Sequence, residues 1–401
     1  MRRLSAAIRQ VHYCLVSRNK TTQLGETLGR RGGRLFGIRQ ADRLFHLFAL
    51  GQTGTGKSTL LGALIRQDIE AARGFCLIDP HGDLADDIAK AMGERGVYWN
   101  VSDPSSPYGY NPLSKVSAAW RPLVASGLVD TLKKQWPEAW GARMEHLLRF
   151  SVLALLGRDD ATLADILPLF LDKEFRKEVV AGIADEQVRH FWTVEYGKLR
   201  YQFTLDGVSP IANKLGAFLA HPVVRKAVCE PEKLLRFRKI MDEGQMLVVN
   251  LAKGRLGADI SNVLGGVIVS NIAGAAYSRQ DQPEKDRRPF FLYVDEFHSF
   301  TTSAFADMLS ELRKYGVGLV LTTQHFARIE PATREAILGN VGTLISFRVG
   351  ATDAALLARQ FGDDHPTARD LVNLANHEVF IKLAVDGVQT KPFSARTLPP
   401  P

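Results

Sequence analysis

The ten residues GQTGTGKSTL at positions 51–60 constrain this chain more than any other stretch of it. They match the phosphate-binding pattern G-x-x-x-x-G-K-S/T, in which glycines let the backbone turn tightly and aim N–H groups at anionic oxygens. An apolar run enters the loop and the helical sequence KSTLLGALIRQDIEAA leaves it, so the positive end of a helix dipole would face the anion. These flanks distinguish the stretch from a chance match in a glycine-rich turn, and they predict a nucleotide-binding loop between a strand and a helix.

Individual residues of the loop have separate predicted roles. Lys57 would place its charge on the β- and γ-phosphates, and the Ser58 hydroxyl would bind Mg²⁺. The other residues predicted to contact the nucleotide are Gly51, Thr53, Gly54, Thr55, Gly56 and Thr59. The sequence NKLG at 213–216 approaches the guanine-reading pattern Asn-Lys-x-Asp but has Gly216 where the aspartate belongs, so ATP is expected rather than GTP.

Short apolar segments recur along the chain and predict the strands of an α/β fold. They are rich in β-branched and aromatic residues and nearly continuous, as strands buried on both faces should be. Helical stretches lie between most of them, which indicates a mostly parallel, doubly wound sheet. The predicted strands are 44–50, 74–79, 246–251, 290–295, 318–324 and 343–349. A late hairpin is expected over 378–393, with its turn at Asp386-Gly387.

Helical periodicity replaces the strand pattern between residues 113 and 240. This predicts an all-helical domain inserted into the nucleotide-binding domain. The expected division is a basic N-terminal arm at 1–40, a P-loop domain made of 41–112 and 241–393, the inserted all-α domain at 113–240, and a disordered tail at 394–401.

The charge of the chain is concentrated at its N-terminus. Residues 1–40 hold nine Arg or Lys and a single acidic residue, Glu26, which accounts for the whole formal net charge of +8. Such an arm would contact the phosphates of nucleic acid or of lipid. A solvated arm without a partner and an organelle transit peptide are the alternatives.

Cysteine usage and hydropathy both favour the cytosol. Cys14, Cys76 and Cys229 form no C-x-x-C pair, so neither a zinc site nor a disulfide framework is indicated. No run of 18 apolar residues occurs, and the nearest, 263–277, is too short to span a bilayer and is predicted to be a buried helix.

The stretch FFLYVDEF supplies a second part of the predicted site. Asp295, at the tip of an apolar strand, would complete the Mg²⁺ shell, and Glu296 would act as general base towards water. A surface acidic pair at a strand end is the alternative, but the phosphate loop earlier in the chain favours the catalytic interpretation.

Three further polar residues are candidates for the site. Gln324 ends the next predicted strand, where it would sense the γ-phosphate or orient water, or else cap the strand. Arg348 lies in the predicted strand 343–349, where burial would require an anionic partner, either a phosphate or carboxylate ligand or a structural ion pair. Arg313 lies just before the strand of Gln324.

Five stretches together resemble the FtsK–HerA superfamily of ring ATPases, with the closest likeness to the coupling proteins of type IV secretion (TraG/TraD-like), which bring DNA to a conjugative channel. They are GQTGTGKSTLL, CLIDPHGDLADDI, LYVDEFHSF, MLSELRKYGVGLVLTTQ and GNVGTLISFRVGATDA. The likeness runs from about residue 36 to 390 and includes the inserted helical domain. It implies a RecA-like P-loop domain that assembles into a hexamer.

The resemblance also implies roles for the residues that match these motifs. Arg313 matches an arginine that reaches the γ-phosphate of a neighbouring subunit, and Arg348 would be a second one. Asp79 and His81, in DPHGD, would help to line the site, although a plain strand-to-turn segment explains them equally well. Lys253 and Arg255, in LAKGRLG, are weaker candidates for a basic DNA loop.

The expected function is therefore ATP-driven movement of DNA in conjugative transfer or type IV secretion. Alternatives are a nucleotide-regulated receptor for DNA–protein substrates, a HerA-like DNA-processing or defence ATPase, and a protein-secretion ATPase. Expected partners are DNA, further copies of the chain, and relaxase, channel or membrane-anchor proteins. The membrane-spanning helices usual in coupling proteins are not found, so a cytoplasmic protein is expected, with peripheral attachment to the inner membrane as an alternative.

Overall fold

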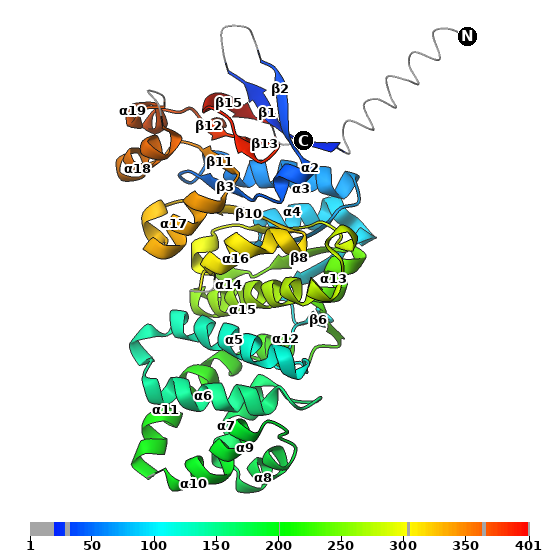
Figure 1. The fold of residues 1–401 in the computed structure, drawn as a ribbon, viewed down its shortest axis with the longest axis vertical. Coiled ribbons are helices and arrows are strands. Elements are labelled where there is room, and N and C mark those ends of the chain that lie inside the picture. Colours follow the sequence, from blue (N-terminus) through cyan, green and yellow to red (C-terminus); the bar gives the residue numbers. More distant parts are fainter. Residues whose placement is uncertain (1–19, 29–32, 200, 303–304, 363–365, 400–401) are drawn as a thin grey trace, which may run out of the picture.

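A large sheet and a separate group of helices lie at opposite ends of an elongated molecule (Figure 1). The computed structural model describes residues 20–28, 33–199, 201–302, 305–362 and 366–399. Much of the predicted basic arm, at 1–19 and 29–32, therefore lies outside the described residues, and so does Cys14.

Seven parallel strands form the centre and one edge of an eleven-stranded sheet. In spatial order they are β11 (Thr343–Ser346), β3 (Leu47–Leu50), β10 (Val317–Thr323), β9 (Phe290–Val294), β4 (Gly74–Asp79), β8 (Met246–Asn250) and β5 (Val97–Asn100). All six strands predicted from apolar runs are confirmed. Only β5 was not predicted, because this short edge strand buries Trp99 alone and shows no apolar run.

Four antiparallel strands continue the sheet beyond β11. They are β12 (Glu378–Lys382), β15 (Phe393–Thr397), β1 (Thr21–Thr27) and β2 (Leu35–Arg39). Strands β1 and β2 fall within the expected arm, and most of β15 falls within the expected disordered tail, so the prediction was wrong for these segments. The polar sequence TTQLGET of β1 gave no apolar signal, because its backbone pairs with β15 and β2 while it buries little besides Thr22 and Leu24.

The predicted late hairpin is confirmed. β13 (Ala384–Val385) and β14 (Val388–Gln389) pair in antiparallel fashion around the expected turn. Asp386 and Gly387 have φ values of 52° and 76°, the left-handed conformation that a two-residue hairpin turn requires.

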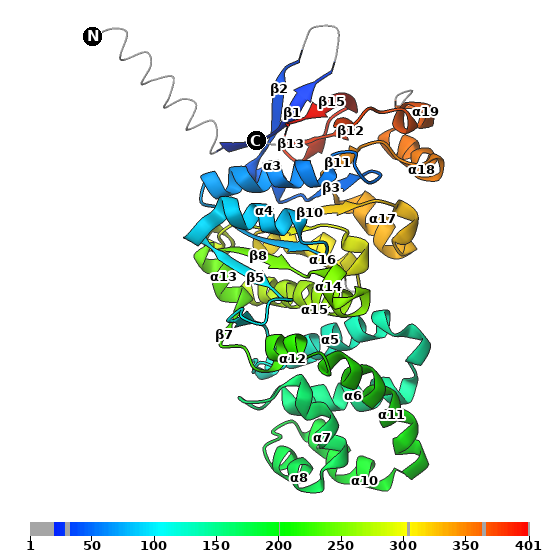
Figure 2. The same cartoon turned by 180° about the vertical axis from the view of Figure 1, so that it is seen from behind.

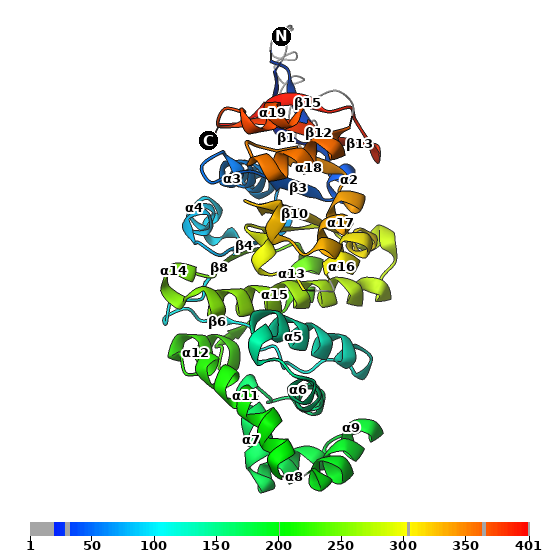
Figure 3. The ribbon, with the colours of Figure 1, turned by 90° about the vertical axis from the view of Figure 1, so that its left-hand side faces the viewer.

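Helices cover both faces of the sheet, and alternate strand residues enter two separate cores. Phe48 and Leu50 of β3 face one core, whereas Leu47 and Ala49 face the other. One face is covered by α3 (Lys57–Glu70) and α4 (Asp83–Met92), seen in front in Figure 2. Figure 3 shows these two helices on one side of the strands. On the other side lie α16 (Phe305–Glu311) and α17 (Pro331–Asn340). The helices of the second face and its ends are α13 (Phe237–Glu243), α15 (Ala258–Tyr277), α16 (Phe305–Glu311), α17 (Pro331–Asn340) and α18 (Ala351–Phe361).

Between 113 and 240, the described residues form helices joined by turns and loops, and the only strand among them is the two-residue β7 (Lys233–Leu234). β7 pairs in parallel with β6 (Tyr108–Gly109), so the chain enters and leaves this region side by side. The helices are α5 (Arg121–Gln135), α6 (Ala142–Leu155), α7 (Ile166–Leu171), α8 (Lys173–Ala181), α9 (Glu186–His190), α10 (Tyr196–Lys198), α11 (Tyr201–Leu219) and α12 (Pro222–Cys229).

Helix α15 joins the helical region to the sheet. It packs against α5 on one side and contributes Val263, Val267 and Ile268 to the core beneath the strands. Among the described residues it is the one helix long and apolar enough to cross a membrane, and most of it is buried inside the protein. The prediction of a buried helix over 263–277 is confirmed. The other short α-helices of the described residues are α2 (Gln40–Arg43), α14 (Lys253–Leu256) and α19 (Ala368–Val372).

Candidate active site

The predicted phosphate loop joins the end of β3 to the start of α3. Gly54 and Gly56 have φ values of 76° and 118°, a range that residues with a side chain rarely adopt. A Cβ on Gly56 would lie 2.7 Å from Nδ1 of His377, and a Cβ on Gly51 would lie 2.5 Å from Cβ of Phe347. The loop therefore needs these glycines both for its turns and for the close packing of Phe347 and His377 behind it.

Lys57 is buried at the first position of α3. Its Nζ donates hydrogen bonds to the carbonyl oxygens of Gly51, at 2.7 Å, and Gln52, at 3.1 Å. Burial lowers the pKa of Lys57, and the nearby carboxylates of Glu296 and Asp295 oppose that shift. The ammonium thus lies inside the loop and faces the acidic pair at the end of β9.

Asp295 follows β9 and is buried. Its carboxylate accepts hydrogen bonds from the Thr322 hydroxyl and, at 3.0 Å, from the backbone N–H of Glu296. Burial raises the pKa of Asp295, and so does the charge of Glu296, whereas the Thr322 hydrogen bond and Lys57 lower it. These two hydrogen bonds hold the Asp295 carboxylate against β10, so its orientation relative to the phosphate loop is fixed.

Glu296 has a left-handed backbone, with a φ of 48°, which is uncommon for a residue with a side chain. Its carboxylate is buried, and Oε2 has no hydrogen-bond partner among the described residues. Nδ1 of His298 lies 3.3 Å from this oxygen. Because burial lowers the pKa of His298 to about 4, the ring is neutral at neutral pH and the contact is not an ion pair.

The last residues of β10 and the residue after it contact three different parts of the site. Thr322 binds Asp295, the Thr323 hydroxyl lies 2.9 Å from His298 Nδ1, and Gln324 accepts a 2.9 Å hydrogen bond from the Thr53 hydroxyl. The sequence analysis predicted Gln324 but missed His298 and the two threonines. The polar run TTQ at the end of an apolar strand was the available signal.

A cleft of about 400 Å³ lies beside the loop. Ser58 and Asp295 line it together with Asp79 and His81, as the sequence analysis expected for the latter two. Asp79 also has a structural role, since its carboxylate accepts backbone N–H groups of His81 and Ala85, both at 2.9 Å, at the start of α4. Burial raises the pKa of Asp79, and Asp295 adds to the rise.

The donor set of this cleft fits Mg²⁺ bound jointly by protein and phosphate. The Ser58 hydroxyl and the Asp295 carboxylate are hard oxygen ligands, as this ion prefers. Within the described ranges, no group of three or more His, Cys, Asp or Glu could hold a metal ion. Mg²⁺ usually keeps few protein ligands and takes the rest from phosphates and water, so two protein oxygens suffice.

Arg348 lies beside the loop, but not inside a strand as predicted. β11 ends at Ser346, and Arg348 is half-buried beyond it, where its carbonyl oxygen accepts a 2.9 Å bond from the Gln52 N–H. The guanidinium donates to the Leu374 carbonyl oxygen, at 3.1 Å, and to the Asn376 side chain, at 2.9 Å. Both acceptors are neutral, so these contacts do not supply the structural ion pair that was one predicted outcome.

Arg313 lies at the opposite edge of the sheet. It is exposed in the turn at Leu312–Tyr315, before β10 begins, and its guanidinium lies 3.4 Å above the ring of Phe45. Because β3 and β10 are parallel, the amino ends near Arg313 and the carboxyl ends near Lys57 are at opposite edges. The structure therefore separates Arg313 from the other predicted site residues of its own chain.

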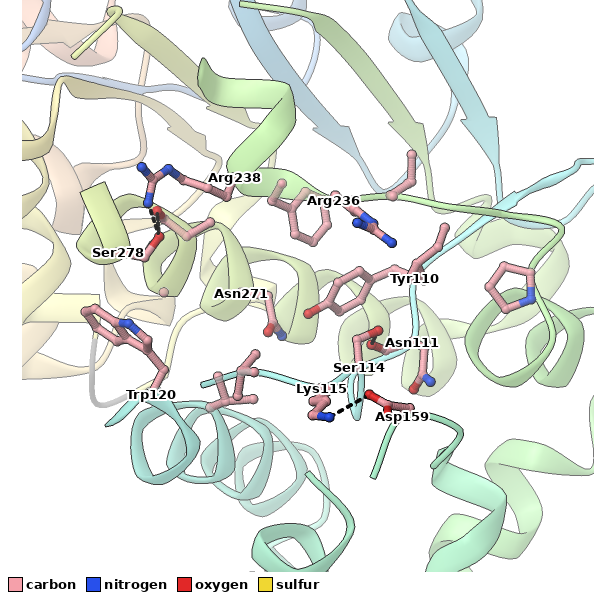
Figure 4. Close-up of a pocket in the computed structure, with 18 of the residues that line it drawn as sticks. Tyr110, Asn111, Ser114, Lys115, Trp120, Asp159, Arg236, Arg238, Asn271 and Ser278 are labelled. Carbon is pink, nitrogen blue, oxygen red and sulfur yellow. Dashed lines mark hydrogen bonds and ion pairs between the residues drawn. The ribbon is translucent and has the colours of Figure 1, made fainter. Parts of the chain in front are cut away.

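A larger cavity, of about 820 Å³, lies between the helical region and the sheet domain (Figure 4). None of the predicted site residues lines it. Among its charged residues, Lys115 lies 2.9 Å from Asp159 and Arg238 donates a 2.9 Å bond to Ser278. These groups are satisfied within the protein, and the chemistry expected from the sequence belongs to the cleft beside the loop.

Comparisons with known proteins found one family model that matches part of this chain. Residues 289–378 match the family model described as the TraM recognition site of TraD and TraG. A comparison with curated protein sequences gave no match.

Solved structures share the fold. The bacterial conjugative coupling protein TrwB, in an unbound form, is similar at 17% identity and a TM-score of 0.65, over 90% of this chain and 86% of that one. Its complex with ADP and Mg²⁺ matches at 18% identity and 0.66, over the same shares of 90% and 86%. VirB4 of Thermoanaerobacter pseudethanolicus matches at 15% identity and 0.66, over 94% and 96%. The RecA-like α/β fold predicted from the sequence is confirmed, because TrwB and VirB4 share it over most of this chain.

Proposed function

We propose that this protein is an ATPase that moves DNA, as a hexameric ring, in conjugative transfer or type IV secretion. The observation that carries the proposal is the meeting of Lys57, Asp295 and Gln324 at the carboxyl edge of the parallel strands. Three segments far apart in the sequence would supply a phosphate cation, a metal carboxylate and a γ-phosphate sensor at the same edge of the sheet. The described fold of the TrwB coupling protein, one of whose structures contains ADP and Mg²⁺, supports the same assignment.

Each group has a defined task in hydrolysis. Lys57 would exchange its loop carbonyl partners for the β- and γ-phosphates. Ser58 and Asp295 would hold Mg²⁺, which would neutralise charge that develops on the phosphates. Glu296 accepts a proton from the attacking water through its unpartnered Oε2. Gln324, held by Thr53 of the loop, contacts the γ-phosphate or the water.

The ring completes the site. Arg313 faces away from the Lys57 cleft of its own chain, so it meets a nucleotide only if a neighbouring copy brings its carboxyl edge alongside. An arginine supplied in this way stabilises the charge that develops during phosphoryl transfer. Arg348, beside the loop with neutral partners, is the second candidate for this task.

Cationic groups near the cleft support DNA as the substrate. Lys253 and Arg328 both lie near enough to depress the pKa of His298, and Arg328 is exposed. Arg255 lies with Lys253 on α14, directly after β8. Together with the basic N-terminal segment they offer contacts for the phosphate backbone. The proposed location is the cytoplasm, with peripheral attachment at the inner membrane through partner proteins of the channel, anchor or relaxase type.

A protein-secretion ATPase is the second candidate. The fold does not distinguish it from the first, because the match to VirB4, which covers 94% of this chain and 96% of that one, has a TM-score of 0.66, the same as that of TrwB with ADP and Mg²⁺. A receptor that recruits DNA–protein substrates, and a DNA-processing or defence ATPase of the HerA type, would use the same cleft.

ATP turnover measured without DNA, with single strands and with duplex separates these functions. A motor should hydrolyse ATP markedly faster with at least one form of DNA. Lys57→Ala, purified in the same way, controls for contaminating ATPases and should show background activity under all three conditions. Turnover in the parent protein that is indifferent to both forms of DNA would contradict the proposed motor and favour the secretion ATPase.

A further inference from the structure

The turn that follows the acidic pair receives a contact from the helical region. Residues Phe297–Ser299 form a short 3-10 helix directly after Glu296, and Thr301 follows it. Lys134, on α5, reaches this turn although it lies 164 residues earlier in the sequence. Its Nζ donates a 3.0 Å hydrogen bond to the His298 carbonyl oxygen and a second bond to the Thr301 hydroxyl.

The same turn carries His298, whose side chain lies beside Glu296, the proposed general base. His298 Nδ1 lies 2.9 Å from the Thr323 hydroxyl and 3.3 Å from Glu296 Oε2. Within the described part of the chain, that glutamate oxygen has no hydrogen bond, so the imidazole is the polar group beside it. Any shift of the His298 backbone would therefore change the surroundings of the base and of the strand end next to Gln324.

The next lysine of the helix provides a natural contrast. Lys133 is about half exposed and lies 3.0 Å from Glu145, so it forms an ion pair within the helical region. Lys134 is turned to the sheet domain and partly buried, and burial lowers its pKa to about 8. Lys133 and Lys134 are adjacent in the sequence, but of the two only Lys134 contacts the turn that follows Glu296.

We infer that Lys134 is a positioning residue through which the helical region controls ATP hydrolysis. Its two hydrogen bonds hold the turn of His298 and Thr301, and this turn holds the imidazole against Glu296. A substrate or partner that moves α5 would thereby alter hydrolysis without touching the nucleotide. The inference rests on the proposed ATPase function, and it assigns the helical region a regulatory contact with the site.

Three variants test the inference, with Lys134→Met as the central one because it retains the apolar stem and removes the donor. Loss of hydrogen bonds from a charged group should lower kcat by about tenfold, while KM and the affinity for a non-hydrolysable ATP analogue change by less than about twofold. Lys133→Met, on the same helix, should match the parent protein. Lys134→Arg, which keeps a cationic donor, should recover part of the lost kcat.

A double variant tests whether the effect passes through His298. If it does, adding Lys134→Met to His298→Ala should lower kcat by much less than it does in the parent protein. Full additivity, an unchanged kcat in Lys134→Met, or a parallel loss of analogue affinity and thermal stability would each overturn the inference. If the parent protein hydrolyses no ATP, the proposed function itself fails, which is a different result from a fully active Lys134→Met.

Discussion

Charged residues at the two edges of the parallel sheet differ in their burial and in their partners. At the carboxyl edge, Lys57, Asp295 and Glu296 are buried next to the phosphate loop, and burial shifts the pKa values of Lys57 and Asp295. At the amino edge, Arg43 is also buried, but both its terminal nitrogens bind the Asp68 carboxylate, at 2.6 and 2.7 Å. Arg313, near the same edge, is instead exposed above Phe45.

This difference distinguishes charges that hold the fold from charges that remain available. Asp68 also pairs with Arg73, at 3.0 Å, so its removal rather than that of Arg43 would leave an uncompensated buried charge. Such a loss commonly costs about 3–5 kcal/mol of unfolding free energy. Arg313 pairs with no carboxylate among the described residues, and the phosphate cleft of its own chain is at the far edge. In the proposed ring, the amino edge of one subunit would meet the carboxyl edge of the next and complete the catalytic site.

The largest expected effect comes from Arg313→Ala. An arginine supplied across an interface commonly contributes ~10³–10⁵-fold to phosphoryl transfer, so this variant should bind ATP normally and scarcely hydrolyse it. Lys57→Ala should fail in the opposite half of the same site. Mixed rings place an intact Lys57 against an intact Arg313 of a neighbour, so mixing the two inactive proteins should restore part of the activity, measured as phosphate release.

Subunit exchange has to be established separately, for example by energy transfer between labelled protomers. Mixed rings that form and stay inactive would contradict a role of Arg313 across the interface. The cross-subunit task would then pass to Arg348.

The second prediction concerns Glu296 within the carboxyl edge. Glu296→Gln retains the shape of the side chain and leaves Lys57 and Asp295 in place, so ATP affinity should persist. Loss of a general base typically lowers turnover by ~10²–10⁴-fold. Pre-steady-state hydrolysis and equilibrium binding of ATP measure the two quantities on one sample. Turnover at half the parent rate would show that another group takes the proton.

The smallest expected effect concerns the basic N-terminal segment. Because β1 begins at Thr21, only residues 1–19 can be removed without cutting into the sheet. If their four arginines contact duplex DNA, deletion should reduce the slope of log affinity against log salt by about 0.9 for each lost phosphate contact. Replacing the four arginines by glutamine is the matched control. It removes the charges but keeps the segment, so its slope should equal that of the deletion. An unchanged slope would assign the segment to lipid or protein, which binding to anionic vesicles then distinguishes.

Local sequence patterns were sufficient to predict the elements that are buried on both faces. The six apolar strands, the phosphate loop and the DEF motif were all predictable, because a strand covered on both sides must be continuously apolar and a phosphate turn must contain glycine. The pattern failed for β1, β2 and β15, whose stability comes from backbone pairing with one another and with β12. Such pairing joins the two ends of the chain and leaves no periodic signal in either.

By itself, the sequence determined which residues are candidates for the chemistry: Lys57, Ser58, Asp295, Glu296 and Gln324 each lie at or next to the end of a predictable element. Only the tertiary structure decided which of them meet. It brought His298 beside both Glu296 and Thr323, and it linked Lys134 of the helical region to the turn of His298. It also gave Arg348 neutral partners and placed Arg313 at the far edge. The physical reason is that residue type and periodicity are local properties, whereas the direction and order of strands in a sheet depend on contacts between segments far apart in the chain.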